Sequence, residues 1–250
     1  MNEPFPFGRP ATRQPVFNLP PVIIATIGAL LAVHAAREWI LTRDVDLKVL
    51  LNFAFIPIRE TDPAGVASVI PGGGARLWTF VTYAFLHGDW AHVSFNALWL
   101  AAFGTPLARR FGVPRFLLFS LAGAVAGALL HLVVYPHDVA PMIGASAAIS
   151  AHMAAVSRFA LTGNPMRAYA FLGDAAYRQP AAPLLTVMRN RTVLTFLGVW
   201  FGLNLLFGLS SIGQGIASGA IAWDAHLGGF AAGLVLFSLF DPVQPAPRSP

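Results

Sequence analysis

The chain has 250 residues, of which 56% are hydrophobic and only 11% are charged, against about 25% charged residues in a typical soluble domain. This composition predicts a polytopic membrane protein. The absence of cysteine excludes disulfides, thiolate metal sites and cysteine catalysis. The net charge is +5, but the basic residues are spread through loops instead of clustering with aromatic residues, so no nucleic acid is expected as a partner.

The two ends of the chain differ in composition from the part between them. Residues 1–17 are rich in proline and phenylalanine and lack the compact layout of a cleaved signal peptide, so they are predicted to form a retained N-terminal cytoplasmic tail. Residues 241–250 are predicted to be a Pro-rich cytoplasmic tail. Residues 18–240, which contain no internal repeat, are predicted to form one membrane domain.

Six apolar segments are long enough to be membrane helices, because a helix needs about 20 mostly apolar residues to cross a bilayer. They lie near 18–38, 79–103, 115–135, 144–161, 192–209 and 219–240. The expected fold class is therefore an all-α membrane protein, a bundle of six transmembrane helices with a long extracytoplasmic first loop.

The positions of the basic residues predict the orientation of this bundle. The N-terminal tail, the second-to-third loop, the fourth-to-fifth loop (162–191) with Arg158 just before it, and the C-terminal tail together hold 11 of the 16 basic residues, which places both termini in the cytoplasm. The first loop, near 39–77, together with Arg37 and Glu38 just before it, balances five basic residues with five acidic ones, and its amphipathic stretches are predicted to lie along the outer interface. The cysteine-free, arginine-rich composition favours a bacterial inner (plasma) membrane.

Polar residues interrupt three of the predicted helices. Ser146 lies at the start of the fourth, His226 lies early in the sixth, and His92 and Asn96 lie four residues apart in the second. With six spans and a cytoplasmic N-terminus, these three helices run in the same direction, from outside to inside. The polar groups are therefore expected at a similar depth in the outer half of the bilayer, where costly polar side chains indicate function.

The spacing of small residues predicts which helices touch. His226, Gly229 and Gly233 are at i, i+3 and i+7, which is one helix face, and two glycines on that face allow close approach of a neighbouring backbone. Residues 144–148 form a patch without a large side chain. Contact between the fourth and sixth helices would bring Ser146 within reach of His226.

This combination suggests nucleophilic catalysis. A serine hydroxyl is a weak nucleophile at neutral pH, so a neutral imidazole must take its proton during attack. The oxyanion that forms needs hydrogen-bond donors in a site of low dielectric. The backbone N–H of Ser146, the amide of Asn96 and the ring of His92 are the candidate donors, and His92 and Asn96 share one helix face.

These residues resemble the rhomboid family of intramembrane serine proteases over about residues 20–240. The matching elements are Gly144-Ala145-Ser146 on the fourth helix, Ala225-His226 with Gly229 and Gly233 on the sixth, and His87, His92 and Asn96 on the second. The resemblance implies that Ser146 and His226 form a catalytic dyad without an aspartate, and that His92 and Asn96 assist at the oxyanion. It further implies cleavage, inside the lipid bilayer, of single-pass transmembrane protein substrates, without metal or cofactor.

The sequence departs from the family pattern at several places. Ala147 stands where the family often has glycine, and its methyl group is expected to narrow the site. Ser150 stands where members often have an aromatic residue beneath the histidine ring. The family's Trp-Arg pair in the first loop is partial, since Trp78 is followed by threonine and the nearest arginine is Arg76.

The remaining polar residues receive structural interpretations. Asp224, two residues from His226, is expected to point elsewhere as an interfacial cap. His87 and His92 would be about 140° apart on a helix, which argues against a metal pair. His131, His137 and Asp138 are expected at the membrane interface, and His34 and His152 in the core or at the lipid edge. Asn204 is expected to form a hydrogen bond between helices. A side entrance for substrate is expected to be lined by Trp200, Phe201 and Leu205.

Two other functions fit parts of the pattern. A non-catalytic rhomboid-like protein that binds membrane helices would normally lack the serine or the histidine, and both are present. A small transporter or channel would have paired intramembrane charges or broken helices in repeated halves, and neither is found in the sequence.

Overall fold

The computed structural model describes residues 19–160, 173–209 and 222–243, so the tail predicted at 1–17 and most of the tail predicted at 241–250 lie outside it. The described part of the chain is helical, with one isolated β-bridge between Phe55 and Met142. The α-helices are α1 (Pro21–Trp39), α2 (Arg43–Phe53), α3 (Ile58–Thr61), α4 (Ala75–Thr82), α5 (Trp90–Trp99), α6 (Thr105–Phe111), α7 (Val113–Val134), α8 (Ser146–Ser157), α10 (Leu184–Val187), α11 (Arg191–Leu209) and α13 (Trp223–Phe240). The same described residues also contain the 3₁₀ segments η1 (Tyr83–Phe85) and η3 (Gly173–Arg178) and the π segment η2 (Leu100–Gly104).

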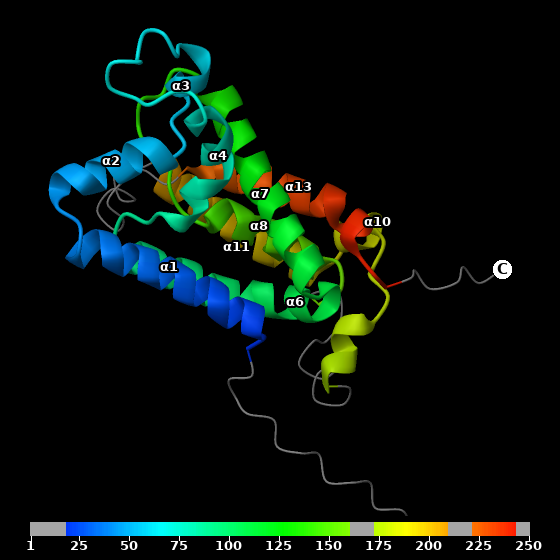
Figure 1. Ribbon diagram of the computed structural model, residues 1–250. Helices are drawn as coiled ribbons and strands as arrows, with labels where there is room; N and C mark the ends of the chain where they lie inside the picture. The colour runs from blue at the N-terminus through cyan, green and yellow to red at the C-terminus, as the bar shows by residue number, and fades with distance from the viewer. Residues whose placement is uncertain (1–18, 161–172, 210–221, 244–250) are drawn as a thin grey trace, which may run out of the picture.

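Within the described residues, α1, α7 and α13 are long and apolar enough to cross a membrane. They correspond to the first, third and sixth segments expected from the sequence. α11 contains a shorter apolar stretch, at the place of the expected fifth segment. The architecture is therefore that of an all-helical membrane protein, whose helices are arranged as Figure 1 shows.

The second expected segment, near 79–103, is wrong in its boundaries. The chain forms α4 and η1, then leaves the helix between Leu86 and Asp89, and begins again as α5. Asp89 causes the restart: its backbone is extended and its carboxylate accepts the backbone N–H of His92 at 2.7 Å, which is an N-cap. The new helix continues through η2 into α6 and ends before Gly112, whose positive φ of 73° closes it.

The fourth expected segment, near 144–161, is shorter than predicted. α8 has 12 residues, which is about 18 Å of helix against a hydrocarbon core of about 30 Å. It follows a loop in which Gly144 has a φ of +117° and donates its N–H to the carbonyl of Tyr83 at 3.0 Å. Ser146 therefore begins a half-length helix instead of a full crossing.

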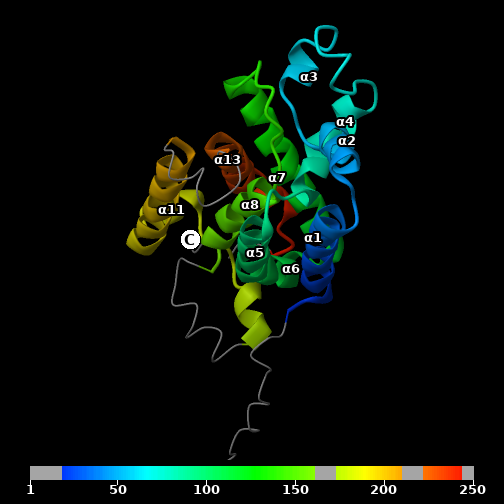
Figure 2. The same ribbon diagram turned by 90° about the vertical axis from the view of Figure 1, so that its left-hand side faces the viewer.

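Helices α7, α8 and α13 lie side by side in both views and pack through small residues (Figures 1 and 2). A Cβ built on Gly229 of α13 would lie 2.0 Å from the carbonyl oxygen of Ala147 on α8, and one built on Gly233 would lie 2.5 Å from that of Ala151. On α7, a Cβ at Gly127 would lie 2.4 Å from the Cβ of Ala147. Such distances are shorter than any real contact, so these backbones approach as only glycine allows.

The segment between α1 and α4 folds against one end of the bundle, where Figures 1 and 2 both show α2, α3 and α4 together. Trp78 donates its indole N–H to the carbonyl of Asn52 at 2.8 Å, and Arg76 pairs with Glu60 at 3.2 Å. Arg59 is buried and donates to backbone carbonyls of the same segment. Burial lowers the pKa of this guanidinium from its ordinary value.

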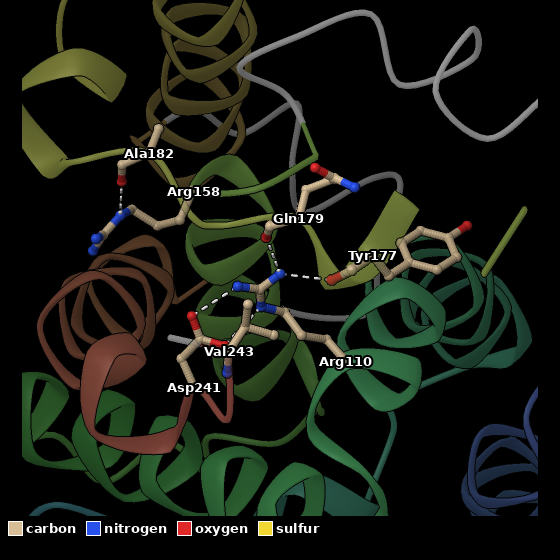
Figure 3. Close-up of polar contacts among 7 residues, drawn as sticks. All are labelled: Arg110, Arg158, Tyr177, Gln179, Ala182, Asp241 and Val243. Atoms are coloured by element: carbon tan, nitrogen blue, oxygen red, sulfur yellow. Dashed lines mark hydrogen bonds and ion pairs between the residues drawn. The ribbon is translucent and has the colours of Figure 1, made fainter. Parts of the chain in front are cut away.

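The opposite end of the bundle is closed by Arg110 at the end of α6 (Figure 3). Its guanidinium makes two bonds to the carboxylate of Asp241, both at 2.8 Å, and further bonds to the carbonyls of Tyr177 and Gln179 at 2.6 and 2.8 Å. Arg158, which follows α8, lies in the same region (Figure 3). The ends of α6, α8 and α13 therefore meet, as expected for helices that run in one direction.

Candidate active site

The starts of α8 and α13 bring Ser146 and His226 together. Ser146 is the first residue of α8, and His226 is the fourth of α13. The serine Oγ lies 2.6 Å from Nε2 of the histidine, which is a short hydrogen bond. This hydrogen bond is possible because Gly229, one turn further along α13, lets the backbones of α8 and α13 approach closely. A serine that can pass its proton directly to an imidazole is the central element of nucleophilic acyl transfer.

Gly144 and His92 form the wall beside this pair. A Cβ on Gly144 would lie 2.7 Å from Nε2 of His92 and 3.7 Å from Oγ of Ser146, so glycine leaves a space bordered by both atoms. The backbone N–H of Gly88 donates to Nδ1 of His92 in a long hydrogen bond of 3.5 Å. If Nδ1 is an acceptor, the ring proton is on Nε2, which faces this space as a donor.

Asn96 and His87 stand next to His92 in different ways. Asn96 is buried on α5, and its amide nitrogen donates to the carbonyl of His92 at 3.0 Å, a bond that uses one of its two N–H groups. The sequence predicted that His87 lies on the same helix as His92 and Asn96. In the structure it lies in the break before α5. Its ring contacts that of His92 edge to face at 4.9 Å, so the angle of about 140° expected for a shared helix does not apply. Within the ranges that the structure describes, no group of three or more His, Asp or Glu side chains is placed to hold a metal.

Asn204, on α11, is the partner of the other histidine nitrogen. The amide oxygen of Asn204 is hydrogen-bonded to Nδ1 of His226, while its amide nitrogen donates to the carbonyl of Trp200 at 2.8 Å. The bond between helices that the sequence predicted for Asn204 is therefore made to the candidate base itself. An amide in an apolar helix signals such a bond, but not its partner.

The side chain of Asp224 does not cap α13, in contrast to the prediction, but contacts His131 inside the bundle. Asp224 is fully buried, and its carboxylate lies 2.7 Å from Nδ1 of His131, which is buried on α7. A carboxylate in a helix interface needs a partner, and His131 is placed to supply it because α7 packs along α13. The sequence feature that could have indicated this pair is the presence of one acidic residue and one histidine in two apolar helices. Because Asp224 is bound to His131, it is not the group that orients His226.

The two departures from the family pattern have local explanations. The methyl group of Ala147 does not narrow the site as expected, because it points into the helix interface, against Gly127 of α7. The hydroxyl of Ser150 donates to the carbonyl of Ser146 at 2.7 Å, inside its own helix. Neither side chain therefore enters the space between Ser146 and His92.

Two further buried histidines, His152 and His34, contact residues other than Ser146 and His226. His152 is buried, as expected, and shares a hydrogen bond of 2.8 Å with Ser120. His34 is buried with its ring edge against Trp90, at 4.7 Å between centroids. Among the residues expected to line a side entrance, Trp200 stacks on Phe230 of α13 at 5.2 Å.

The fold and the site together define a helical integral membrane protein that carries a serine–histidine pair at the adjoining starts of two parallel helices. The model of the family described as the Rhomboid domain matches residues 74–241, about two thirds of the chain. The chain belongs to the rhomboid family.

Curated relatives agree with this assignment. The chain is 31% identical over 173 residues to RHOMBOID-like protein 12, mitochondrial, of Arabidopsis thaliana, a match that covers 65% of this chain and 46% of the relative. It is 30% identical over 156 residues to Rhomboid protease GluP of Bacillus subtilis, covering 62% and 24%. Rhomboid-related protein 3 of Homo sapiens is 36% identical over 84 residues, covering 32% and 20%. The matched region thus spans less than half the length of each of these relatives.

Proposed function

We propose that this protein is an intramembrane serine endopeptidase that cleaves transmembrane segments of single-pass membrane proteins. The observation that carries the proposal is the hydrogen bond of 2.6 Å between Ser146 Oγ and His226 Nε2, with Nε2 of His92 on the other side of the space at Gly144. Nucleophile, base and a candidate oxyanion donor then surround one position for a reacting carbonyl. One matched relative carries the name Rhomboid protease, which agrees with this chemistry.

The proposed reaction proceeds through an acyl-enzyme. Ser146 Oγ attacks the scissile carbonyl while its proton passes to Nε2 of His226, and the carbonyl oxygen becomes an oxyanion. The donors for it are the backbone N–H of Ser146, the Nε2–H of His92 and the second N–H of Asn96. His226 then protonates the leaving amine, and the C–N bond breaks. A water molecule that gives its proton to His226 attacks the ester and releases the carboxylic acid and the free serine.

The half-length of α8 supports a buried position for this chemistry. If α8 ends near one membrane surface, its 12 residues place Ser146 roughly 18 Å away, inside a hydrocarbon core of about 30 Å. The start of α8 also presents unpaired backbone N–H groups and the positive end of the helix dipole to the oxyanion.

The proposal includes a topology. It comprises six membrane helices, a first loop on the extracytoplasmic side, both termini in the cytoplasm, and the inner membrane of a bacterium as location. The active site would open to the outer side, where water enters. A substrate helix would unwind to reach Ser146, and the surrounding lipid bilayer would present it laterally.

The test is cleavage of a fluorescently tagged single-pass substrate by the purified full chain in detergent, next to Ser146→Ala. Labelling with a fluorophosphonate, which reacts with activated serines whatever the substrate, is measured in parallel. We expect cleavage and labelling by the wild type and neither by the variant. A folded wild type that binds the substrate helix but shows neither reaction would identify a non-catalytic helix-binding protein. Equal cleavage by both would identify a wrong nucleophile.

A further inference from the structure

We propose that Asn204 is a positioning residue that holds His226 in the tautomer needed for catalysis, so that the site works as a Ser146–His226–Asn204 chain of hydrogen bonds. This inference rests on the proposed function. It starts from the contact between the amide oxygen of Asn204 and Nδ1 of His226, which joins α11 to α13.

The orientation of the Asn204 amide follows from its second partner. The carbonyl of Trp200, 2.8 Å away, accepts a hydrogen bond and donates none, so the group that faces it is the NH₂ of Asn204. The amide oxygen is then directed at His226. An oxygen acceptor requires a proton on Nδ1, which leaves the lone pair of Nε2 free for the hydroxyl of Ser146. The amide thus selects the tautomer in which His226 is a base toward Ser146.

Within the described residues, neither Asp224 nor Ser150 takes this role. The carboxylate of Asp224, two residues before the histidine, is bound to His131 on another face of α13. Ser150, which stands where a ring would otherwise lie beneath the imidazole, bonds to its own helix. An unpaired Nδ1–H in an apolar interface would cost free energy, and Asn204 removes that cost in the productive tautomer alone.

The amide is also suited to a membrane interior. A carboxylate at position 204 would accept the same bond but would bring a charge into an apolar helix pair, which is costly. Asparagine supplies the acceptor without the charge. The stacking of Trp200 on Phe230, at 5.2 Å and 29°, holds α11 against α13 at the turn that also positions the amide.

The test uses the full chain and four variants: Asn204→Leu, which removes the acceptor, Asn204→Asp, which restores it, Leu203→Ala as an exposed neighbour on the same helix, and Ser146→Ala. The fluorophosphonate labelling rate, kcat, KM and the melting temperature are measured for each. We expect Asn204→Leu to lower the labelling rate and kcat by roughly 10–100-fold, part of the 10²–10⁴ that a general base contributes, with KM unchanged. Asn204→Asp recovers most of both rates, and Leu203→Ala behaves as the wild type.

The possible outcomes separate the two proposals. If the wild type neither labels nor cleaves, the proposed function fails. If the wild type reacts, Ser146→Ala does not, and Asn204→Leu reacts at the wild-type rate, only the role of Asn204 fails. The role of Asn204 also fails if Asn204→Leu and Asn204→Asp lose equal amounts of labelling rate and kcat. It fails as well if the loss of rate follows the fall in melting temperature across all variants. Either result would indicate an effect on helix packing instead of tautomer selection.

Discussion

The contact between α8 and α13 at Gly229 makes the sharpest prediction, because one added methyl group should separate Ser146 from His226. In Gly229→Ala the new Cβ would lie 2.0 Å from the carbonyl oxygen of Ala147 and 2.7 Å from its carbonyl carbon. Both atoms are backbone, so no side-chain rotation relieves the clash. The two helices must move apart.

The size of this movement follows from the distances. An ordinary C···O contact is about 3.3 Å or more, so α13 must shift by roughly 1.3 Å from α8. Ala147 follows Ser146 directly, and Gly229 is one turn from His226, so the shift is transmitted to their bond of 2.6 Å. A shift of that size along the bond takes it beyond the limit of about 3.0 Å for an O–H hydrogen bond.

The expected result is a loss of activity greater than the loss of stability. A misplacement of about 1 Å at a catalytic group costs about 10²-fold in rate. Overpacking costs about 1–3 kcal/mol, and each kcal/mol lowers the melting temperature of a chain of this size by about 2–4 °C. The assay is kcat for substrate cleavage and the fluorophosphonate labelling rate in detergent, together with thermal unfolding.

Two other glycines supply graded and matched controls. In Gly233→Ala the Cβ would lie 2.5 Å from the carbonyl of Ala151, so the required shift is smaller and further from the serine, and a smaller loss of rate is expected. Gly202→Ala on α11 meets nothing within 4 Å and should leave the rate unchanged. A wild-type rate in Gly229→Ala, or a greater loss of rate in Gly233→Ala, would refute the reasoning.

Three further predictions concern other contacts. Gly144→Ala puts a side chain at a backbone φ of +117° and a Cβ into the space beside the hydroxyl of Ser146. We expect a loss of about 1–3 kcal/mol in the free energy of unfolding and a loss of fluorophosphonate labelling. A labelled, fully stable variant would contradict this. Asp224→Ala leaves His131 without its partner, and thermal unfolding should show a loss of about 1–2 kcal/mol, whereas an unchanged melting temperature would mean that the pair contributes nothing. Asp241→Ala removes the carboxylate that pairs with the fully buried side chain of Arg110. Thermal unfolding should show a loss of about 3 kcal/mol in stability, with kcat of the folded protein unchanged. A fall in kcat without a fall in stability would argue against a purely structural contact.

The sequence by itself determined the membrane character of the chain and the chemical groups of the site. Apolar length is a one-dimensional property, and so is the position of a polar residue along a helix. Counting the six predicted spans gave a predicted direction for each helix, and with it the expectation that Ser146, His226 and His92 lie near one depth. The spacing of His226, Gly229 and Gly233 likewise placed the glycines on the face that touches α8, since the period of a helix is known.

The break before α5 has a local signal in the sequence, but the hydropathy of the segment hides it. Gly88-Asp89 carries an N-cap signal, since Asp89 accepts the N–H of the residue three positions on. The N-cap signal has no effect on the predicted segment near 79–103, because hydropathy averaged over a long window does not detect a turn of four residues. The error moved His87 onto a helix to which it does not belong.

The tertiary structure alone decided the partners of Asn204, Asp224 and His131. A helical period tells which residues share a face, but not how far the helix is rotated about its axis or which neighbour that face meets. Asn204 and His226 come from helices joined by residues outside the described part of the chain, and Asp224 and His131 are 93 positions apart. The close packing of α7, α8 and α13 at glycine and alanine sets the rotations that pair His131 with Asp224 and His226 with Ser146, and the position of α11 on α13 gives His226 its second partner.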